Sequence, residues 1–376
     1  MPKHTDTDKY SLMTKENKNI DIFLQLLREE LWQQKPSVVP LPQDTLHTVL
    51  EYANEQCLQG LVINSLFRRK ADIGKDNVFR LFSLVRNIEA NNSRMNSAVK
   101  RLADVLNRHS IRYVVFKGQT AAYYYPDSLL RMPGDIDFYC HEEDYSIAKE
   151  VIEREMSVEF SPRDITDRHD TFSYNGIRFE MHYKMEILGS SRHQSCYDNI
   201  MGEAVMAPLY INIGSTRVAT LNATDNALHV FKHLFNHLLV EGVGLRQFCD
   251  LAMIISNNSC RIDADALDMK LRSIGYHKAF FAVGALLVRY LGMPVDKFPF
   301  RLTDPDYVWG DRIFRTVMSS GNFGRSNRRV VGGKIRRSLD TARLAFGHCL
   351  VFFPLAPTDI IFLIPRRIMI SLKHYL

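Results

Sequence analysis

Two stretches decide the fold: residues 113–120 read YVVFKGQT, and residues 131–139 read RMPGDIDFY. The first has the β-branched and aromatic residues of a strand that ends at a glycine, and the second begins another strand, which carries Asp135 and Asp137. Residues two apart on a strand point to the same face, so both carboxylates are expected to lie together while the apolar residues beside them face the core. Neighbouring carboxylates repel each other unless a cation lies between them, and Mg²⁺ is the usual one. The pattern predicts a metal site for phosphoryl or nucleotidyl transfer.

A third carboxylate strengthens this prediction. Asn175-Gly176 separates two alternating runs, residues 170–174 and 177–183, which predicts a β-hairpin. Alternation along its second strand, from residue 177 to 183, puts Glu180 and His182 on one face. If this strand lies beside residues 135–138, three carboxylates converge, as in sites where two metal ions hold the attacking and leaving oxygens of an in-line displacement.

Together these residues resemble the DNA polymerase β nucleotidyltransferase superfamily, and more closely an uncharacterised bacterial branch of it, over roughly residues 80–256. No single motif suffices, but the set is specific. The matching motifs are Phe116-Lys117-Gly118, Tyr124-Tyr125-Pro126, Arg131-x-x-Gly134-Asp135-Ile-Asp137, Glu180-x-His182 and Leu245-Arg246-x-x-x-Asp250.

The resemblance implies an enzyme that transfers a nucleoside monophosphate from an NTP to a hydroxyl group of a small molecule, sugar or protein. Asp135 and Asp137 would hold two Mg²⁺ ions, with Mn²⁺ as the alternative metal. Glu180 would hold the ion that activates the acceptor. Gly118 would let the backbone approach the triphosphate, because a side chain there would collide with it.

The glycine loop departs from the superfamily pattern. Gly118 is followed by Gln119 and Thr120 rather than by serine or glycine. Thr120 or Gln119 would then replace the missing hydroxyl, and Lys117 or Arg131 would supply positive charge to the phosphates. This departure favours a second hypothesis, a catalytically weak or inactive protein that binds a nucleotide or a partner on the same fold.

Each candidate also has a purely structural interpretation. The aspartates could be solvated acids at a strand end, and Glu180 could pair with Arg178. Lys117 could be a surface cation. Arg131 could hold its own loop through a salt bridge to Asp127 or Asp135.

Histidines recur every fourth residue at positions 229, 233 and 237. Such spacing can build a transition-metal site, but a step of four residues drifts around the helix, so the side chains do not point at one place. A polar wall of the active cleft and plain packing of neutral histidines are the alternatives. The candidates for the cleft wall are His182, His237, Arg246 and Asp250.

The predicted fold class is α+β, with a small mixed β-sheet nucleotidyltransferase domain flanked by helical regions. A long amphipathic helix is expected over residues 76–109, and only helices are expected after residue 224. The predicted divisions are an N-terminal helical region (1–78), the nucleotidyltransferase domain (79–221), a helical domain (222–324) and a basic, apolar tail (325–376).

The net charge of +6 comes from the tail, which has ten lysines and arginines against two aspartates. The rest of the chain is slightly acidic, so no specific nucleic-acid partner is predicted. Residues 344–364 are apolar but contain Pro354 and Pro357, which disfavours a membrane span. Either residues 343–367 lie on an anionic membrane surface, or the apolar segment docks onto the helical domain; RNA binding is a third alternative. Scattered cysteines and a polar N-terminus predict a cytoplasmic protein, with association at the inner membrane surface as the alternative that residues 343–367 add.

Overall fold

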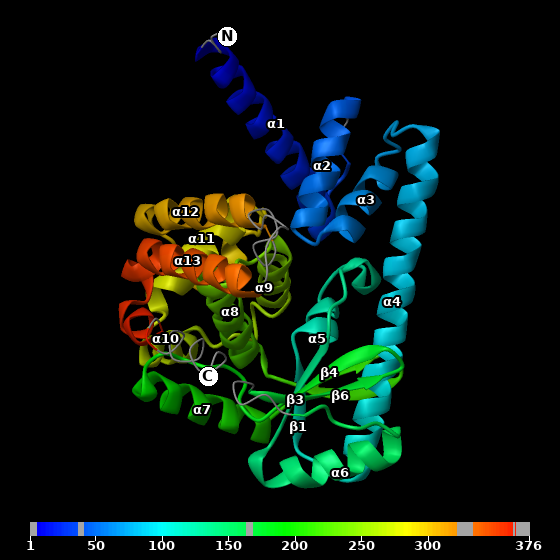
Figure 1. Ribbon diagram of the computed structural model, residues 1–376, viewed down its shortest axis with the longest axis vertical. Helices are drawn as coiled ribbons and strands as arrows, with labels where there is room; N and C mark the ends of the chain where they lie inside the picture. Colours follow the sequence, from blue (N-terminus) through cyan, green and yellow to red (C-terminus); the bar gives the residue numbers. More distant parts are fainter. Residues whose placement is uncertain (1–5, 37–40, 163–167, 322–333, 364, 366–376) are drawn as a thin grey trace.

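The computed structural model describes residues 6–36, 41–162, 168–321, 334–363 and 365. A small β-sheet with flanking helices lies at one end of the molecule, the first three helices lie at the other end, and a helical region lies beside both (Figure 1). The long helix α4 runs along one side and connects the two ends. The α+β fold class predicted from the sequence is confirmed.

The N-terminal helices hold the loop that leads into the site. They are α1 (Asp6–Leu31), α2 (Gln43–Glu55), α3 (Gln59–Arg68) and α4 (Lys75–Arg108). A Cβ at Gly60 would lie 2.1 Å from the backbone oxygen of Leu130, so only glycine lets α3 pack this closely on the loop. The buried Asn92 of α4 donates from Nδ2 to the backbone oxygens of Leu129 and Arg131, both at 2.7 Å. The backbone of this loop is therefore fixed from two sides.

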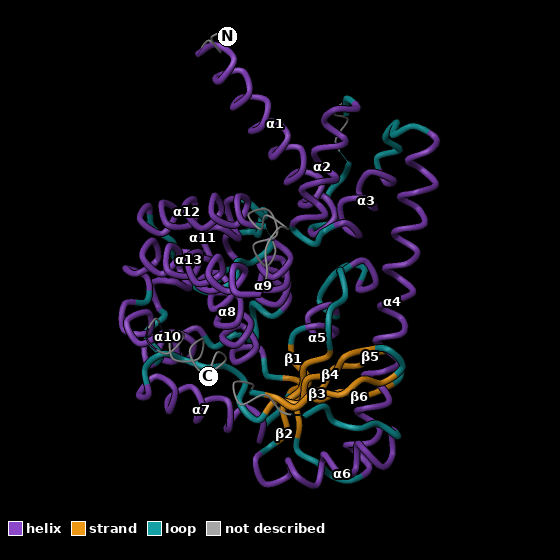
Figure 2. Tube along the Cα trace, in the orientation of Figure 1, coloured by secondary structure: helices purple, strands orange, loops and turns teal. Residues whose placement is uncertain are grey.

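The main sheet is mixed and has the strand order β1-β2-β4-β3. Its strands are β1 (Tyr113–Phe116), β2 (Ile136–Cys140), β3 (His169–Tyr174) and β4 (Ile177–His182) (Figure 2). β1 pairs antiparallel with β2, β2 parallel with β4, and β4 antiparallel with β3. Asn175 and Gly176 both have positive φ, 51° and 74°, so the predicted hairpin turn is confirmed.

One face of this sheet packs into a hydrophobic core. Phe138, Phe179 and Met181 are completely buried there, together with residues of α4 and α6 (Tyr145–Met156). The two-stranded sheet of β5 (Leu209–Ile213) and β6 (Thr216–Thr220) adds to the same core. The opposite face carries the polar residues of the site.

The helical region covers the polar face. Its helices are α7 (Ser191–Met206), α8 (Ala223–Val240), α9 (Leu245–Asn257), α10 (Ala264–Ser273), α11 (His277–Arg289) and α12 (Asp304–Ser320). α8 is buried along most of its length, and its His229 ring meets the Phe116 ring of β1 edge-on at 4.7 Å. The covered end of this face excludes solvent from polar side chains, as His182 shows with 0% exposure.

The described part of the tail docks onto the helical region. α13 (Lys334–Phe352) packs against α8, and His348 Nδ1 lies 2.7 Å from the backbone oxygen of Leu238. Asp359 accepts hydrogen bonds from the backbone N–H groups of Gly189 (2.6 Å) and Ser190 (3.1 Å) and from the Tyr276 hydroxyl. The sequence left two main alternatives for the apolar segment, membrane contact and docking onto the helical domain, and its described residues are docked.

Membrane contact stays a prediction. Six apolar residues of the docked tail are exposed on its outer side: Phe346, Leu350, Val351, Phe353, Ile361 and Phe362. Within the predicted basic tail, residues 325–333, 364 and 366–376 lie outside the described residues. No described helix combines the length and the apolar character that a membrane crossing needs.

Candidate active site

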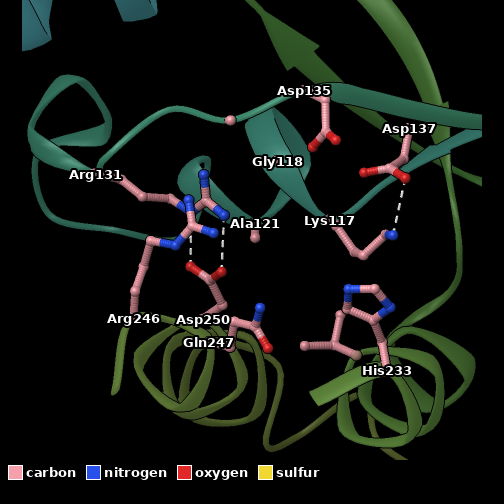
Figure 3. A pocket seen from close by; sticks show the side chains of 12 residues that line it. Lys117, Gly118, Ala121, Arg131, Asp135, Asp137, His233, Arg246, Gln247 and Asp250 are labelled. Atoms are coloured by element: carbon pink, nitrogen blue, oxygen red, sulfur yellow. Dashed lines mark hydrogen bonds and ion pairs between the residues drawn. The ribbon is translucent and has the colours of Figure 1, made fainter. Parts of the chain in front are cut away.

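The two aspartates come from β2 and from the residue just before it. Asp135 and Asp137 project to the same side and face the Lys117 side chain (Figure 3). Asp137 pairs in register with Phe116 of β1 and with Glu180 of β4. Because directly paired residues share a face of a sheet, Asp137 and Glu180 lie side by side, as the strand alternation predicts.

Asp137 is 5% exposed and has two close partners. Lys117 Nζ lies 2.9 Å from its Oδ1, and His182 Nε2 lies 2.9 Å from the same oxygen. Burial alone would raise the pKa of Asp137, but Lys117 and His182 outweigh it and hold that pKa well below the usual range. Asp137 is therefore a carboxylate at neutral pH.

Glu180 differs from Asp137 in its charge balance. Burial, and then the neighbouring charges of Asp137 and Asp135, raise the pKa of Glu180 to about 7. Its ion-pair partner is Arg178, at 3.2 Å, and that arginine is largely exposed. Glu180 thus lies where negative charge exceeds positive charge, which is the environment that a bound cation would relieve.

Two histidines lie next to Glu180. His169 Nδ1 is 3.6 Å and His182 Nε2 is 3.7 Å from Glu180 Oε2. Burial lowers the pKa of each imidazole to about 4, so both are neutral at pH 7. One ligand atom from each of the three residues lies within 4.8 Å of the others. Together with the aspartates, these donors fit a divalent cation.

The glycine loop presents backbone rather than side chains. Gly118 has φ +37°, and a Cβ there would lie 3.2 Å from the backbone oxygen of Asp135. Gln119 is buried and donates to Asn96 Oδ1 of α4 at 2.6 Å. Thr120 is fully buried and donates to the Lys117 backbone oxygen at 2.8 Å. The side chains after Gly118 are thus directed into the fold, and neither lines the pocket.

Arg131 forms a salt bridge, but with a partner other than the two that the structural interpretation named. Its Nε and Nη2 donate to the two oxygens of Asp250, at 2.7 and 2.8 Å, rather than to Asp127 or Asp135. The Tyr125 hydroxyl donates to the same carboxylate at 2.7 Å. This buried, two-pronged pair joins the loop before β2 to α9.

Arg246, from the first turn of α9, lies beside this pair (Figure 3). Its Nη1 donates to the Met132 backbone oxygen at 3.0 Å, whereas its buried Nε has no hydrogen-bond partner among the described residues. Burial and the neighbouring Arg131 lower its pKa. Arg246 is therefore a cation with little compensating charge, which suits it to an anionic ligand.

These groups surround one pocket (Figure 3), whose empty volume is about 480 Å³ when the adjoining open solvent is included. The predicted residues that line it are Lys117, Gly118, Arg131, Asp135, Asp137, Arg246 and Asp250. Gly134, Ala121, Val230, His233 and Gln247 also line it and were not predicted. Glu180 and His182 lie next to Asp137 on the sheet, outside the pocket lining.

The three histidines of α8 have separate partners. His229 Nδ1 lies 2.6 Å from the Tyr197 hydroxyl, and His233 Nδ1 lies 2.6 Å from Glu186 Oε1. His237 Nδ1 lies 3.4 Å from Glu241 and does not line the pocket. Among the described residues these three histidines form no metal-binding group. The cleft wall on α8 is formed instead by Val230 and His233.

The prediction missed His169, although the sequence contains a signal for it. A two-residue turn at Asn175-Gly176 pairs Tyr174 with Ile177, and counting outward pairs His169 with His182. The predicted strand started at residue 170, so it ended one residue short of this histidine.

Comparison with known protein families supports the family resemblance that the sequence motifs indicated. A family model described as "Uncharacterised nucleotidyltransferase" matches residues 42–292, more than half of the chain. The chain belongs to this family. The match confirms the resemblance that the motifs indicated, and it makes the protein a member of a nucleotidyltransferase family in which the activity is uncharacterised.

Among solved structures, this chain is similar to an antigenic nucleotidyltransferase-like protein from Paracoccidioides brasiliensis. The identity is 13%, the match covers 43% of this chain and 74% of that chain, and the TM-score is 0.31. No curated protein matches the sequence.

Proposed function

We propose that this protein transfers a nucleoside monophosphate from an NTP to a hydroxyl acceptor in a reaction that depends on Mg²⁺. The observation that carries the proposal is the alignment of Asp137 with Glu180 across two paired strands, with Asp135 at the entry of the same strand and an open pocket beside it. An acceptor oxygen would attack the α-phosphorus, the bond to the β-phosphate oxygen would break, and pyrophosphate would leave. Two bound metal ions would neutralise charge on the attacking and leaving oxygens.

The chain's own residues supply positioning and charge. Asp135 and Asp137 would hold both ions, and Glu180 would share the ion on the acceptor side. On the acceptor side, the Glu180 carboxylate would also be placed to accept the proton that the acceptor hydroxyl loses. Before metal binds, Lys117 neutralises Asp137 at 2.9 Å. With a metal ion bound to Asp137 in its place, the Lys117 ammonium would be available to the phosphates.

The phosphates of the NTP would lie in the pocket between the glycine loop and α9. Gly118 leaves room for them, and Arg246 provides a guanidinium with an unused buried N–H. Arg131 is committed to Asp250, so it would position the loop and would not bind phosphate directly.

A second candidate function is nucleotide or partner binding without efficient transfer. The buried side chains of Gln119 and Thr120 favour it, because they leave the loop without a hydroxyl group for phosphate. Calorimetric titration with each NTP, with and without Mg²⁺, separates the two functions. Equal NTP affinity in both conditions would favour the binding protein, whereas strict dependence on metal supports the enzyme.

The decisive test uses the Asp137→Asn variant in a transfer assay with four labelled NTPs and cell lysate as acceptor. Transfer should fall by several orders of magnitude, because the amide cannot hold metal as the carboxylate does. Asp296→Asn is the matched control, since Asp296 is exposed and distant in sequence from the site. Circular dichroism should show both variants folded. Undiminished transfer by folded Asp137→Asn would refute the proposed function.

A further inference from the structure

Beside the aspartate pair lies a second group of metal donors with a different chemistry. His169 of β3 is paired with His182 of β4, and Glu180 is two residues before His182 on the same strand. All three side chains therefore share the polar face of the sheet and meet at one corner of it. Their ligand atoms lie within 4.8 Å of one another.

The spacing is close to that of ligands around one ion. Imidazole nitrogens and carboxylate oxygens bind first-row transition metals at about 2.0–2.2 Å, which places neighbouring ligand atoms roughly 3–3.6 Å apart. Glu180 Oε2 lies 3.6 Å from His169 Nδ1 and 3.7 Å from His182 Nε2. Two of the three distances are thus close to this range, and the third, between the two imidazole nitrogens, is within 4.8 Å.

The hydrogen bonds of His182 leave one nitrogen in an unfavourable contact. Nδ1 lies 3.3 Å from the backbone oxygen of Lys184, and Nε2 lies 2.9 Å from Asp137 Oδ1. Both neighbours are acceptors, yet a neutral imidazole has one N–H to donate. Nε2 makes the shorter contact, so Nε2–H donates to Asp137 and the bare Nδ1 faces the Lys184 carbonyl oxygen; a cation bound at Nε2 would let Nδ1–H donate to that carbonyl instead. A ligating histidine commonly donates its second N–H to a backbone carbonyl in this way.

His169 gives an independent indication. Its Nδ1 is buried and makes no hydrogen bond among the described residues, although it faces Glu180. A buried polar atom without a hydrogen bond is costly, and metal coordination satisfies it.

We propose that His169, Glu180 and His182 form a site for a first-row transition-metal dication that binds there in preference to Mg²⁺. Two imidazole nitrogens favour Mn²⁺, Fe²⁺, Co²⁺ or Zn²⁺, whereas Mg²⁺ takes oxygen ligands. Asp137, which touches His182, is available to bridge this ion to the pocket. The further role of this ion, at the acceptor side of the transfer reaction, rests on the proposed function; the metal site itself does not.

The test uses the full-length protein after treatment with a chelator, and Co²⁺ as the probe. The wild type should bind Co²⁺ with a visible absorption spectrum that persists in excess Mg²⁺. His169→Gln should weaken Co²⁺ binding at least about tenfold. His47→Gln is the matched control, because His47 is an exposed histidine of α2, and it should bind as the wild type does. Equal Co²⁺ affinity in His169→Gln and the wild type would overturn the proposal, as would displacement of Co²⁺ by equimolar Mg²⁺.

A spectroscopic measurement on the wild type guards against misfolding of the variant. Mn²⁺ bound to protein labelled with ¹⁵N-histidine should show nitrogen couplings from directly bound imidazole in pulsed electron paramagnetic resonance. Mn²⁺ without such coupling would contradict the proposed ligand set, whatever the variant does.

Asp135→Asn separates this inference from the proposed function. Asp135 does not belong to the histidine group, so this variant should keep the Co²⁺ spectrum and lose transfer. If no transfer is found with any metal while His169→Gln still loses Co²⁺, the metal site stands and the transfer function fails. If transfer is lost in Asp137→Asn while His169→Gln binds Co²⁺ as the wild type does, the transfer function stands and the histidine metal site fails.

Discussion

Removing the carboxylate of Asp250 should destabilise the protein more than removing any exposed acid. The Asp250 side chain is 7% exposed and that of Arg131 4% exposed. The Asp250 carboxylate accepts two hydrogen bonds from the Arg131 guanidinium and a third from the Tyr125 hydroxyl. Asp250→Ala would leave a buried guanidinium facing a cavity, with Arg246 beside it. Loss of one partner of a buried pair costs about 3–5 kcal/mol.

A pair of further variants separates the cost of an unpaired buried charge from the cost of lost packing. Arg131→Met should cost a similar amount, because it leaves the Asp250 carboxylate buried with only the Tyr125 hydroxyl. Combining Arg131→Met with Asp250→Leu removes both charges, so the double variant should be far more stable than the sum of the single effects predicts.

Urea unfolding followed by circular dichroism and tryptophan fluorescence measures these free energies, provided that both signals change together. The control is Asp268→Ala, which breaks partly exposed pairs with Arg272 and His277 and should cost at most about 1 kcal/mol. A loss below about 1 kcal/mol in Asp250→Ala, or strictly additive effects in the double variant, would refute the reasoning.

Three further predictions follow from the charges and contacts. Glu180→Gln should stabilise the metal-free protein increasingly as the pH rises from about 4.5 to 7, and by a constant amount above that, because the raised pKa makes ionisation of Glu180 unfavourable in the folded state. Urea unfolding of both proteins across this pH range measures the difference in unfolding free energy. A difference that does not change with pH would contradict the prediction. Gln119→Ala should lower stability by about 1–2 kcal/mol and leave the NTP affinity measured by calorimetry unchanged, because the Gln119 amide donates a hydrogen bond to Asn96 of α4 and does not line the pocket. A selective loss of NTP affinity would show that the side chain reaches the ligand. Asp359→Ala should release the tail segment and speed its cleavage in limited proteolysis, since three hydrogen bonds hold this carboxylate; unchanged cleavage would show that apolar packing alone holds the segment.

Local periodicity predicted the parts of the site that depend on strand geometry. The alternation around Ile136 and Phe179, together with the Asn175-Gly176 turn, was enough to put the carboxylates and His182 on one face. The strands and the long helix α4 also agree with the predicted ranges within one or two residues.

What could not be predicted depends on contacts between distant segments. Arg131 and Asp250 are 119 residues apart, and no local pattern indicates that they pair. The inward direction of Gln119 depends on α4, which supplies Asn96. The burial of His182 arises because α8 covers the sheet. Helices α7 and α12 were not predicted, and neither positions a residue of the pocket lining.

Helix α8 connects two regions that otherwise lie apart. Val230 and His233 line the pocket, and Leu238 accepts the contact from His348 of the tail. These positions span roughly 8–12 Å along one rigid helix. A ligand whose binding shifts α8 would therefore change how firmly the tail is seated. Thermodynamic reciprocity then requires that whatever binds or displaces the tail changes the affinity of the pocket by the same factor.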